Sequence, residues 1–312
     1  MNNFHKSTVT LHPYYVTGFI DGEGCFHLSI GKNASSKIGY SVGLSFSIGL
    51  NKKDIDLLKL IKAFFGGIGK LSVINDNVVL WRVRSIEEIK VIIDHIESFP
   101  LRTKKRIDFF LLKEAFRIIN DKDHIKEEGF IKLVSLKASM NKGLSNNFKD
   151  AFPDTKLSLA NYDKEIPNFL DIEFKDLDST WIAGFTEAEG CFFLTVQENT
   201  AKGSYQVKIG YQVSQHVRDT LLIKSLIKYF ECGRTEPAGK SGISFRVTKL
   251  RNIIEVIIPF FGEYPLLGNK AKDFRDWKEI AQLMENKAHL TKEGLNKIKE
   301  IKSKMNSLRY TQ

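Results

Sequence analysis

Polar and apolar residues alternate along the first half of the chain in a way that predicts strands. Every second residue is apolar in residues 26–30 and 42–48, and shorter apolar segments follow at 71–74 and 79–83. A period of two is typical of strands that bury one face, because successive side chains point to opposite sides. Glycine, asparagine, serine and lysine between the first two segments predict a turn.

Four other segments of the first half space their apolar residues as helices do. They cover residues 53–65, 86–99, 104–119 and 130–140. A short helix also precedes the first strand, where Pro13 suits an opening helical turn. The expected order is therefore helix, two strands, helix, two strands and further helices.

The second half of the chain repeats this order at a constant distance. Beyond the first pair of strands, matching residues lie 165 positions apart, and a duplicated unit is the simplest explanation. We therefore expect a monomer with an internal pseudo-twofold axis rather than a homodimer. The matching positions are Asp54 and Asp219, Pro100 and Pro265, Lys105 and Lys270, Lys113 and Lys278, His124 and His289, Gly129 and Gly294, and Met140 and Met305.

One short stretch occurs twice, as VTGFIDGEGCF from position 16 and IAGFTEAEGCF from position 182. Small residues lie four apart in each copy, Gly18 and Gly22 in the first and Gly184 and Ala188 in the second. This spacing places them on one helical face, where small side chains let two backbones approach closely. We predict two short helices that pack against each other.

Each predicted helix ends with an acid before a glycine, Glu23 in the first copy and Glu189 in the second. Glycine is a common stop signal, but a carboxylate beside the negative end of the helix dipole is unfavourable by roughly 0.3–1 kcal/mol. Two such ends in contact would be tolerable with a cation between them. Hard divalent cations prefer oxygen ligands of this kind.

Both stretches resemble the LAGLIDADG motif of homing endonucleases, over residues 16–24 and 182–190, although the second copy has Thr186 and Glu187 where Ile and Asp would stand. The resemblance implies an α+β fold of two tandem αββαββα units, with two antiparallel four-stranded sheets forming a DNA-binding saddle. We expect a first domain at 1–150, a linker at 151–177 and a second domain at 178–312.

The formal net charge of +10 favours a polyanionic partner. Nucleic acid is preferred to a membrane surface, because no anchor or spanning segment is evident. Three cysteines with no metal-binding spacing suit an intracellular, reducing compartment, and the N-terminus lacks the apolar region of a secretion signal. Abundant Lys, Ile and Asn are consistent with an AT-rich organellar genome, such as a mitochondrial one.

The polar faces of the predicted strands are the candidate DNA-binding surface, because a sheet can enter the major groove and read base edges there. The halves differ at most of these positions, so we expect an asymmetric target. The basic segments at 102–106 and 297–304 are candidates for phosphate contacts, although helical Glu–Lys pairs explain the second equally well. The candidate face residues are His27, Ser29, Ser41, Ser45, Ser47, Lys70, Ser72, Arg82 and Arg84, then Phe193, Thr195, Gln197, Asn199, Lys208, Gln212, Arg234, Ser244, Arg246 and Thr248.

The resemblance also assigns the chemistry. Glu23 and Glu189 would bind divalent metal, with help from the backbone carbonyls of Gly22 and Ala188. Mg²⁺ is expected, and Mn²⁺ or Ca²⁺ could replace it, Ca²⁺ without cleavage. The resemblance assigns three further catalytic residues. Lys105 and Lys270 would organise active-site water or offset charge at the phosphate, and Gln212 would order water beside the metal.

Phosphodiester hydrolysis needs an activated water and neutralisation of phosphoryl charge, and bound metal supplies both. We therefore predict a site-specific endonuclease that makes a metal-dependent double-strand break, with 3′ overhangs implied by the resemblance. An intron RNA splicing maturase ranks second. A non-cleaving DNA-binding regulator is third, and a basic globular protein without nucleic acid fails to explain the paired motifs.

Overall fold

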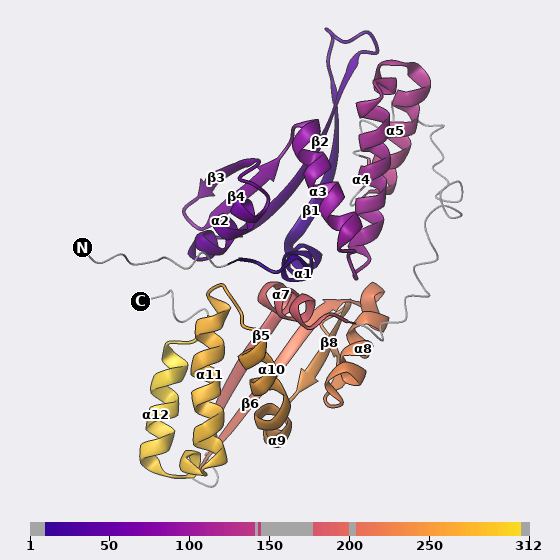
Figure 1. The fold of residues 1–312 in the computed structure, drawn as a ribbon. Coiled ribbons are helices and arrows are strands. Elements are labelled where there is room, and N and C mark those ends of the chain that lie inside the picture. The colour runs from indigo at the N-terminus through magenta and orange to yellow at the C-terminus, as the bar shows by residue number, and fades with distance from the viewer. Residues whose placement is uncertain (1–9, 141–142, 145–176, 200–203, 307–312) are drawn as a thin grey trace, which may run out of the picture. The chain divides into compact units, whose positions relative to one another are not determined.

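The computed structural model describes residues 10–140, 143–144, 177–199 and 204–306. Contacts divide the chain into two compact units (Figure 1). The first unit comprises Met1–Pro13 and Glu23–Glu173, and the second comprises Tyr14–Gly22 and Phe174–Gln312. Most of the first motif helix therefore groups with the second half of the chain. The expected linker at 151–177 lies outside the described residues except for Leu177.

The first unit contains one antiparallel sheet in the order β1-β2-β4-β3. Its side chains alternate between buried and accessible along β1 and β2, as the period of two predicts. Helices cover the apolar face, where Phe46 and Trp81 pack edge to face (Figure 1). The elements are α1(Pro13–Glu23), β1(Gly24–Lys32), β2(Tyr40–Asn51), η1(Lys52–Asp54), α2(Ile55–Phe64), β3(Lys70–Asn75), β4(Val78–Val83), α3(Ile86–Ser98), α4(Lys105–Asn120), η2(Asp123–Ile125) and α5(Glu127–Ser139).

The second unit contains a matching sheet in the order β5-β6-β8-β7. Phe192, Tyr211 and Trp277 are fully buried in its core. Pro237 lies on β7, an edge strand, where a missing backbone N–H is tolerated. The elements are α7(Ser179–Glu189), β5(Gly190–Asn199), β6(Ser204–His216), η5(Val217–Asp219), α8(Thr220–Phe230), β7(Arg234–Ala238), β8(Gly242–Val247), α9(Leu250–Asn252), η6(Ile253–Ile257), α10(Ile258–Glu263), α11(Lys270–Glu285), η7(Ala288–Leu290) and α12(Lys292–Ser303).

The two sheets confirm the predicted α+β class, and the helices confirm the repeat. Helix α11 begins and ends 165 positions after α4, and η7 lies 165 positions after η2. A Cβ at Gly129 would lie 2.2 Å from the Asp123 carbonyl oxygen, and one at Gly294 would lie 2.0 Å from that of Ala288. Both units therefore use a glycine for the same close approach of a helix to the preceding turn.

The small residues of α1 and α7 pack the two helices backbone to backbone, as predicted. A Cβ at Gly18 would lie 2.1 Å from the carbonyl oxygen of Trp181, and one at Gly184 would lie 2.0 Å from that of Tyr15. Real Cβ atoms do not approach backbone so closely, so no larger residue fits without moving a helix. We call this contact, within the second unit, the helix seam.

Replacing Gly184 with alanine should therefore destabilise the protein by about 2–3 kcal/mol, because the new methyl group must displace a rigid backbone. The free energy of unfolding from chemical denaturation measures this loss. Gly262→Ala is the matched control, since Gly262 is also helical but a Cβ there meets nothing within 4 Å. That change should be neutral or stabilise by up to about 1 kcal/mol. Equal effects of the two changes would contradict the close approach.

Candidate nucleic-acid interface and acidic helix ends

Each helix of the seam donates a hydrogen bond from an aromatic side chain to a buried acid of the other helix. The Tyr15 hydroxyl donates to Glu187 Oε2 at 3.0 Å, and Trp181 Nε1 donates to Asp21 Oδ2 at 2.8 Å. Both carboxylates are almost fully buried. Buried charge requires such partners, so the two bonds make the acidic motif residues tolerable inside the protein.

The Glu187 carboxylate also anchors the loop that leads into α11. Its Oε2 atom accepts hydrogen bonds from the backbone N–H groups of Leu267 at 2.9 Å and Gly268 at 3.0 Å. Burial raises the pKa of Tyr15 well above its usual value, and the adjacent Glu187 charge raises it further. Tyr15 therefore stays protonated and donates to the carboxylate at any physiological pH.

The C-terminal end of α7 is surrounded by polar side chains of the second unit. Gln215 Nε2 donates to Glu189 Oε1 at 3.1 Å, which orients that carboxylate. The ammonium group of Lys270, the first residue of α11, donates to the carbonyl oxygen of Gly190. A cation at the carbonyl end of a helix is favourable, so Lys270 offsets the negative charge gathered there.

Gln215 is a site residue that the sequence analysis missed. The pairing of Gly190 with Val213 places Gln215 two residues farther along β6, on the same side as Val213 and toward the end of α7. Position 50, its match in the first half, is Leu50, so the repeat gave no signal. Gln212 instead lies on the open sheet face, and its amide oxygen accepts hydrogen bonds from Arg246. Its role beside the metal stays a prediction.

The described residues contain no cluster of three or more His, Cys, Asp or Glu side chains suited to a metal ion. A divalent ion at the motif ends would therefore depend on isolated carboxylates, backbone carbonyls, water and substrate oxygens. A Cβ at Gly22 would lie 3.1 Å from Glu189 Cγ, so the Gly22 backbone passes directly beside that acid. Oxygen donors of this kind fit a hard cation, which commonly keeps several waters.

In the first unit, the predicted face residues lie on the side of the sheet opposite the core. His27 pairs with Ser45, and Ser47 pairs with Arg82. Partial desolvation lowers the pKa of His27, and the positive charges of Lys137 and Arg82 lower it further. Arg82 and three other candidates, Lys70, Ser72 and Arg84, line one hollow of about 450 Å³.

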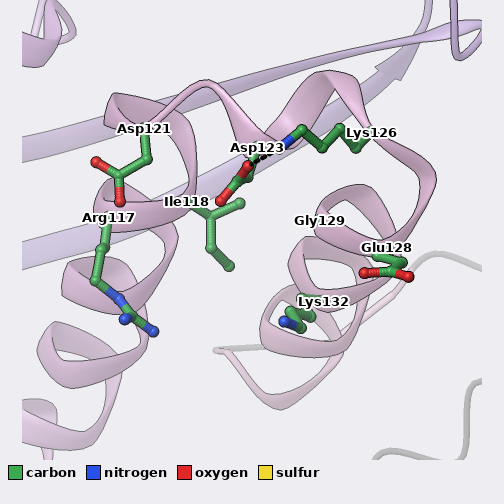
Figure 2. Close-up of a pocket in the computed structure, with 8 residues that line it drawn as sticks. All are labelled: Arg117, Ile118, Asp121, Asp123, Lys126, Glu128, Gly129 and Lys132. Atoms are coloured by element: carbon green, nitrogen blue, oxygen red, sulfur yellow. Dashed lines mark hydrogen bonds and ion pairs between the residues drawn. The ribbon is translucent and has the colours of Figure 1, made fainter.

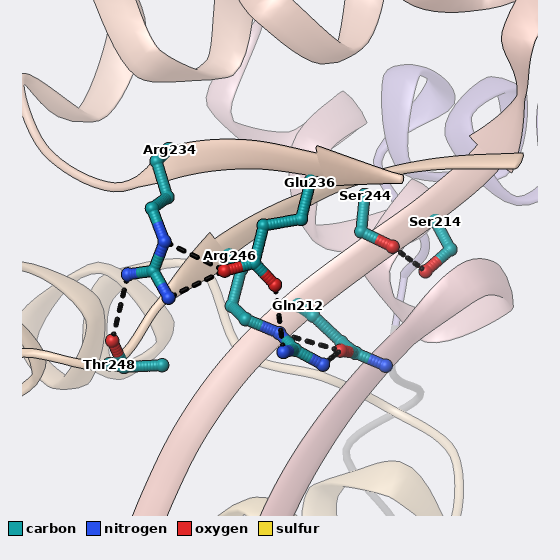
Figure 3. A network of polar contacts seen from close by, with 7 residues as sticks. All are labelled: Gln212, Ser214, Arg234, Glu236, Ser244, Arg246 and Thr248. Atoms are coloured by element: carbon teal, nitrogen blue, oxygen red, sulfur yellow. Dashed lines mark hydrogen bonds and ion pairs between the residues drawn. The ribbon is translucent and has the colours of Figure 1, made fainter. Parts of the chain in front are cut away.

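In the second unit, a polar network crosses three strands of the open face (Figure 3). It links the predicted residues Gln212, Arg234, Arg246 and Thr248 through Glu236, which the sequence analysis did not select. Lys208 and Gln197 are exposed, and Thr195 is half-buried. The backbone of Asn199 pairs with that of Ser204 at the end of β5.

Two expectations need correction because the side chains are buried. Ser244 is only 5% exposed, and its hydroxyl group lies 2.7 Å from that of Ser214, with which it shares a hydrogen bond. Arg106, in the basic segment at 102–106, is only 6% exposed, which argues against a phosphate contact by Arg106 itself, whereas Arg102, Lys104 and Lys105 are half-buried. In the segment at 297–304, Lys304 pairs with Glu300 at 2.7 Å, as the helical alternative predicts.

A second hollow lies at the turn between α4 and α5 (Figure 2). It has a volume of about 320 Å³ and mixes basic with acidic side chains. Its Lys126–Asp123 ion pair is exposed, where such pairs contribute little. None of the predicted site residues lines it.

All three cysteines have free thiols. Burial raises the pKa of Cys191, so its thiol stays protonated. Among the described helices, none is both long and apolar enough to cross a membrane.

Two motif helices that each end in an acid, and two sheets that each have one open face, define a class of protein. A family model described as LAGLIDADG endonuclease matches residues 16–116 and 182–281. The chain therefore belongs to the LAGLIDADG endonuclease family, with two motifs in one polypeptide.

Curated relatives and solved structures agree with this assignment. The chain is 36% identical to probable intron-encoded endonuclease 3 of Neurospora crassa, over 94% of this chain and 54% of that protein. It is 37% identical to probable intron-encoded endonuclease 2 of the same fungus, over 95% of this chain and 65% of that protein. The chain thus spans between half and two thirds of these relatives.

The structure is similar to that of the LAGLIDADG homing endonuclease I-SmaMI bound to cleaved DNA. The TM-score is 0.88 at 37% identity, over 96% of this chain and 98% of the other. The structure of I-SmaMI bound to an uncleaved DNA target in the presence of calcium ions is also similar. Its TM-score is 0.88 at 37% identity, over 95% of this chain and 99% of the other. I-GzeII in complex with its DNA target gives 0.85 at 34% identity, over 96% and 99%.

Removing the Tyr15 hydroxyl should cost about 1 kcal/mol of unfolding free energy, because Glu187 keeps its two backbone donors. Glu187→Gln should cost about 2 kcal/mol, since an amide serves three donors poorly. The double change should cost less than the sum, which a double-mutant cycle measures by denaturation. Tyr205→Phe, on an exposed tyrosine of β6, is the control and should be neutral. Strict additivity would show that the two groups do not interact.

Proposed function

We propose that this chain is a site-specific homing endonuclease that makes a metal-dependent double-strand break in a long, asymmetric DNA target and leaves 3′ overhangs. Family membership supports it, and similar structures contain DNA targets. The observation that carries the proposal is the end of α7, where Gln215 orients the Glu189 carboxylate and Lys270 binds the next carbonyl oxygen. An oriented acid beside a cation suits phosphodiester chemistry better than a structural role.

Glu23 and Glu189 would hold divalent ions, with the backbone carbonyls of Gly22 and Ala188. Glu23 follows Gly22 directly in the chain, and the Gly22 backbone lies against Glu189. When bound, Mg²⁺ supplies charge neutralisation on phosphoryl oxygens and an acidified water. Calcium was present with uncleaved DNA in one similar I-SmaMI structure, which fits a hard oxygen-liganded site.

Two lysines and two glutamines would assist the motif acids, the lysines by neutralising negative charge and the glutamines by orienting the carboxylate and water. Lys270 holds positive charge at the helix end, where the scissile phosphate would lie, and Lys105 is its match 165 positions earlier at the start of α4. Gln215 fixes one Glu189 oxygen, which leaves the carboxylate a defined direction. Gln212 would act on the open face beside Arg246, where it can also order water.

The two open sheet faces would bind the DNA. The first presents Lys70, Arg82 and Arg84 around one hollow, and the second presents Arg234 and Arg246 in a network. Basic side chains of this kind provide phosphate and base contacts in the major groove. Because the matching positions carry different residues in the two units, the two half-sites should differ in sequence.

We infer an organellar gene. The two Neurospora relatives are named as intron-encoded, and a Saccharomyces cerevisiae relative, 23% identical over 334 residues, is named as mitochondrial protein RF1. A splicing role on intron RNA is the alternative for the same basic surface. Specific binding of intron RNA by a chain that leaves DNA intact would select that alternative.

Glu23→Gln and Glu189→Gln should each abolish double-strand cleavage, because a neutral amide binds divalent metal poorly, while DNA binding stays within about threefold. The target is first selected from a randomised duplex library with the unchanged chain and Mg²⁺. Cleavage of this target is then measured with Mg²⁺, and its binding is measured with Ca²⁺. Glu285→Gln is the control, an exposed acid at the end of α11. Full cleavage by either motif variant would remove the metal assignment.

Gln215→Leu should slow cleavage of one DNA strand by about 10–100-fold and leave the other strand unchanged, because only one unit has a glutamine at this position. Strand-specific end labels report the two rates separately. Gln282→Leu, on the exposed side of α11, is the control. If both strands slowed equally, the change would have acted through the fold rather than through Glu189.

A further inference from the structure

The guanidinium group of Arg246 is held on three sides on the open face of the second sheet. Its Nε and Nη2 atoms donate to Gln212 Oε1 at 3.1 and 2.7 Å, and Nη1 donates to Glu236 Oε2 at 2.8 Å (Figure 3). The Phe193 ring lies 4.9 Å from the guanidinium carbon, within cation–π range. The side chain is still 34% exposed, so it is fixed without being sealed off.

The same carboxylate holds a second arginine. Arg234 Nε donates to Glu236 Oε1 at 2.7 Å, and Arg234 Nη1 donates to the Thr248 hydroxyl at 3.1 Å. Glu236 therefore bridges two guanidinium groups on neighbouring strands. Since it is 29% exposed, the bridge is partly shielded from water and restricts both side chains.

An acid is costly on a surface that binds a polyanion, because it repels phosphates. The first unit shows that the sheet does not need one. Lys70 pairs with Arg82 there as Arg234 pairs with Arg246, and the position that matches Glu236 is Ser72. Both cations of the first unit are thus free of a bridging acid at that position. Glu236 therefore has a role other than attracting the phosphate backbone of the DNA.

The bonds to Gln212 and Glu236 leave some N–H donors of Arg246 available to a ligand. A guanidinium group has five N–H donors, and the three bonds of Arg246 use the Nε–H, one on Nη2 and one on Nη1. The Nε and Nη2 pair is one edge of the fork, so one N–H on Nη1 and one on Nη2 remain. These two form the outer edge when Glu236 accepts the Nη1 hydrogen that points toward Cδ. Two parallel donors match the O6 and N7 acceptors of guanine in the major groove.

We propose that Glu236 is a specificity-determining residue: together with Gln212 it fixes Arg246 so that its outer edge reads a guanine in the DNA bound by the second unit. This inference rests on the DNA-binding part of the proposed function. A mobile arginine would follow the nearest phosphate and carry no sequence information. The bridging carboxylate disfavours phosphate contact and aligns the fork with a base edge instead.

The test compares base preferences of the full chain and its Glu236→Gln variant, using a randomised duplex library bound with Ca²⁺ and sequenced. At one position of the half-site, the guanine preference should fall about fivefold or more, while affinity for non-target duplex rises. Arg246→Lys keeps the charge but lacks the fork, so it should lose the same preference at the same position. Both variants should unfold at the temperature of the unchanged chain within a few degrees.

Glu255→Gln is the matched control, because Glu255 also accepts from an arginine, Arg251, in an exposed pair on the covering helices. It should leave every base preference unchanged. Selective binding whose preferences do not change in Glu236→Gln would overturn this inference and leave the endonuclease proposal intact. Absence of sequence-selective binding by the unchanged chain would overturn both.

Discussion

The close contact between two helix backbones is the constraint on which the second unit depends. Gly18 and Gly184 bring α1 and α7 so near that no Cβ fits at either position. Aromatic side chains then reach across, and their polar tips bind the buried acids of the opposite helix. The seam is therefore both packed and polar. A purely apolar seam would allow sliding, whereas directional bonds to Asp21 and Glu187 fix one register.

That register extends to the helix end through a short series of contacts. Glu187 binds the backbone before α11, and α11 begins with Lys270, whose ammonium group binds the carbonyl oxygen after Glu189. The buried acid and the candidate metal ligand are thus two residues apart on one helix, and they are linked again through the loop. Their positions depend on each other, so the contacts that fix the helix seam also fix the position of the C-terminal end of α7.

The sequence contained most of the fold but only part of the site. Period and repeat predicted both sheets, and the spacing of Gly18 and Gly184 predicted the seam, because these signals are local. Gln215 and Glu236 were missed, since each acquires its role from strand pairing that no local pattern encodes. Ser244 and Arg106 were predicted to contact DNA because one is polar and the other basic. Both are buried by tertiary packing, which the residue type alone does not indicate.

The duplicated halves kept what the backbone requires and changed what faces outward. Gly129 and Gly294 make the same approach to a carbonyl oxygen, and a substitution at either would displace a helix. By contrast, the pairs Ser72 and Glu236, and Leu50 and Gln215, differ completely, although each residue keeps the equivalent partner on the neighbouring strand. Side chains at such positions differ between the halves while both four-stranded sheets keep the same strand order. A single chain can therefore evolve two unequal recognition surfaces on one repeated scaffold, which a symmetric homodimer cannot do.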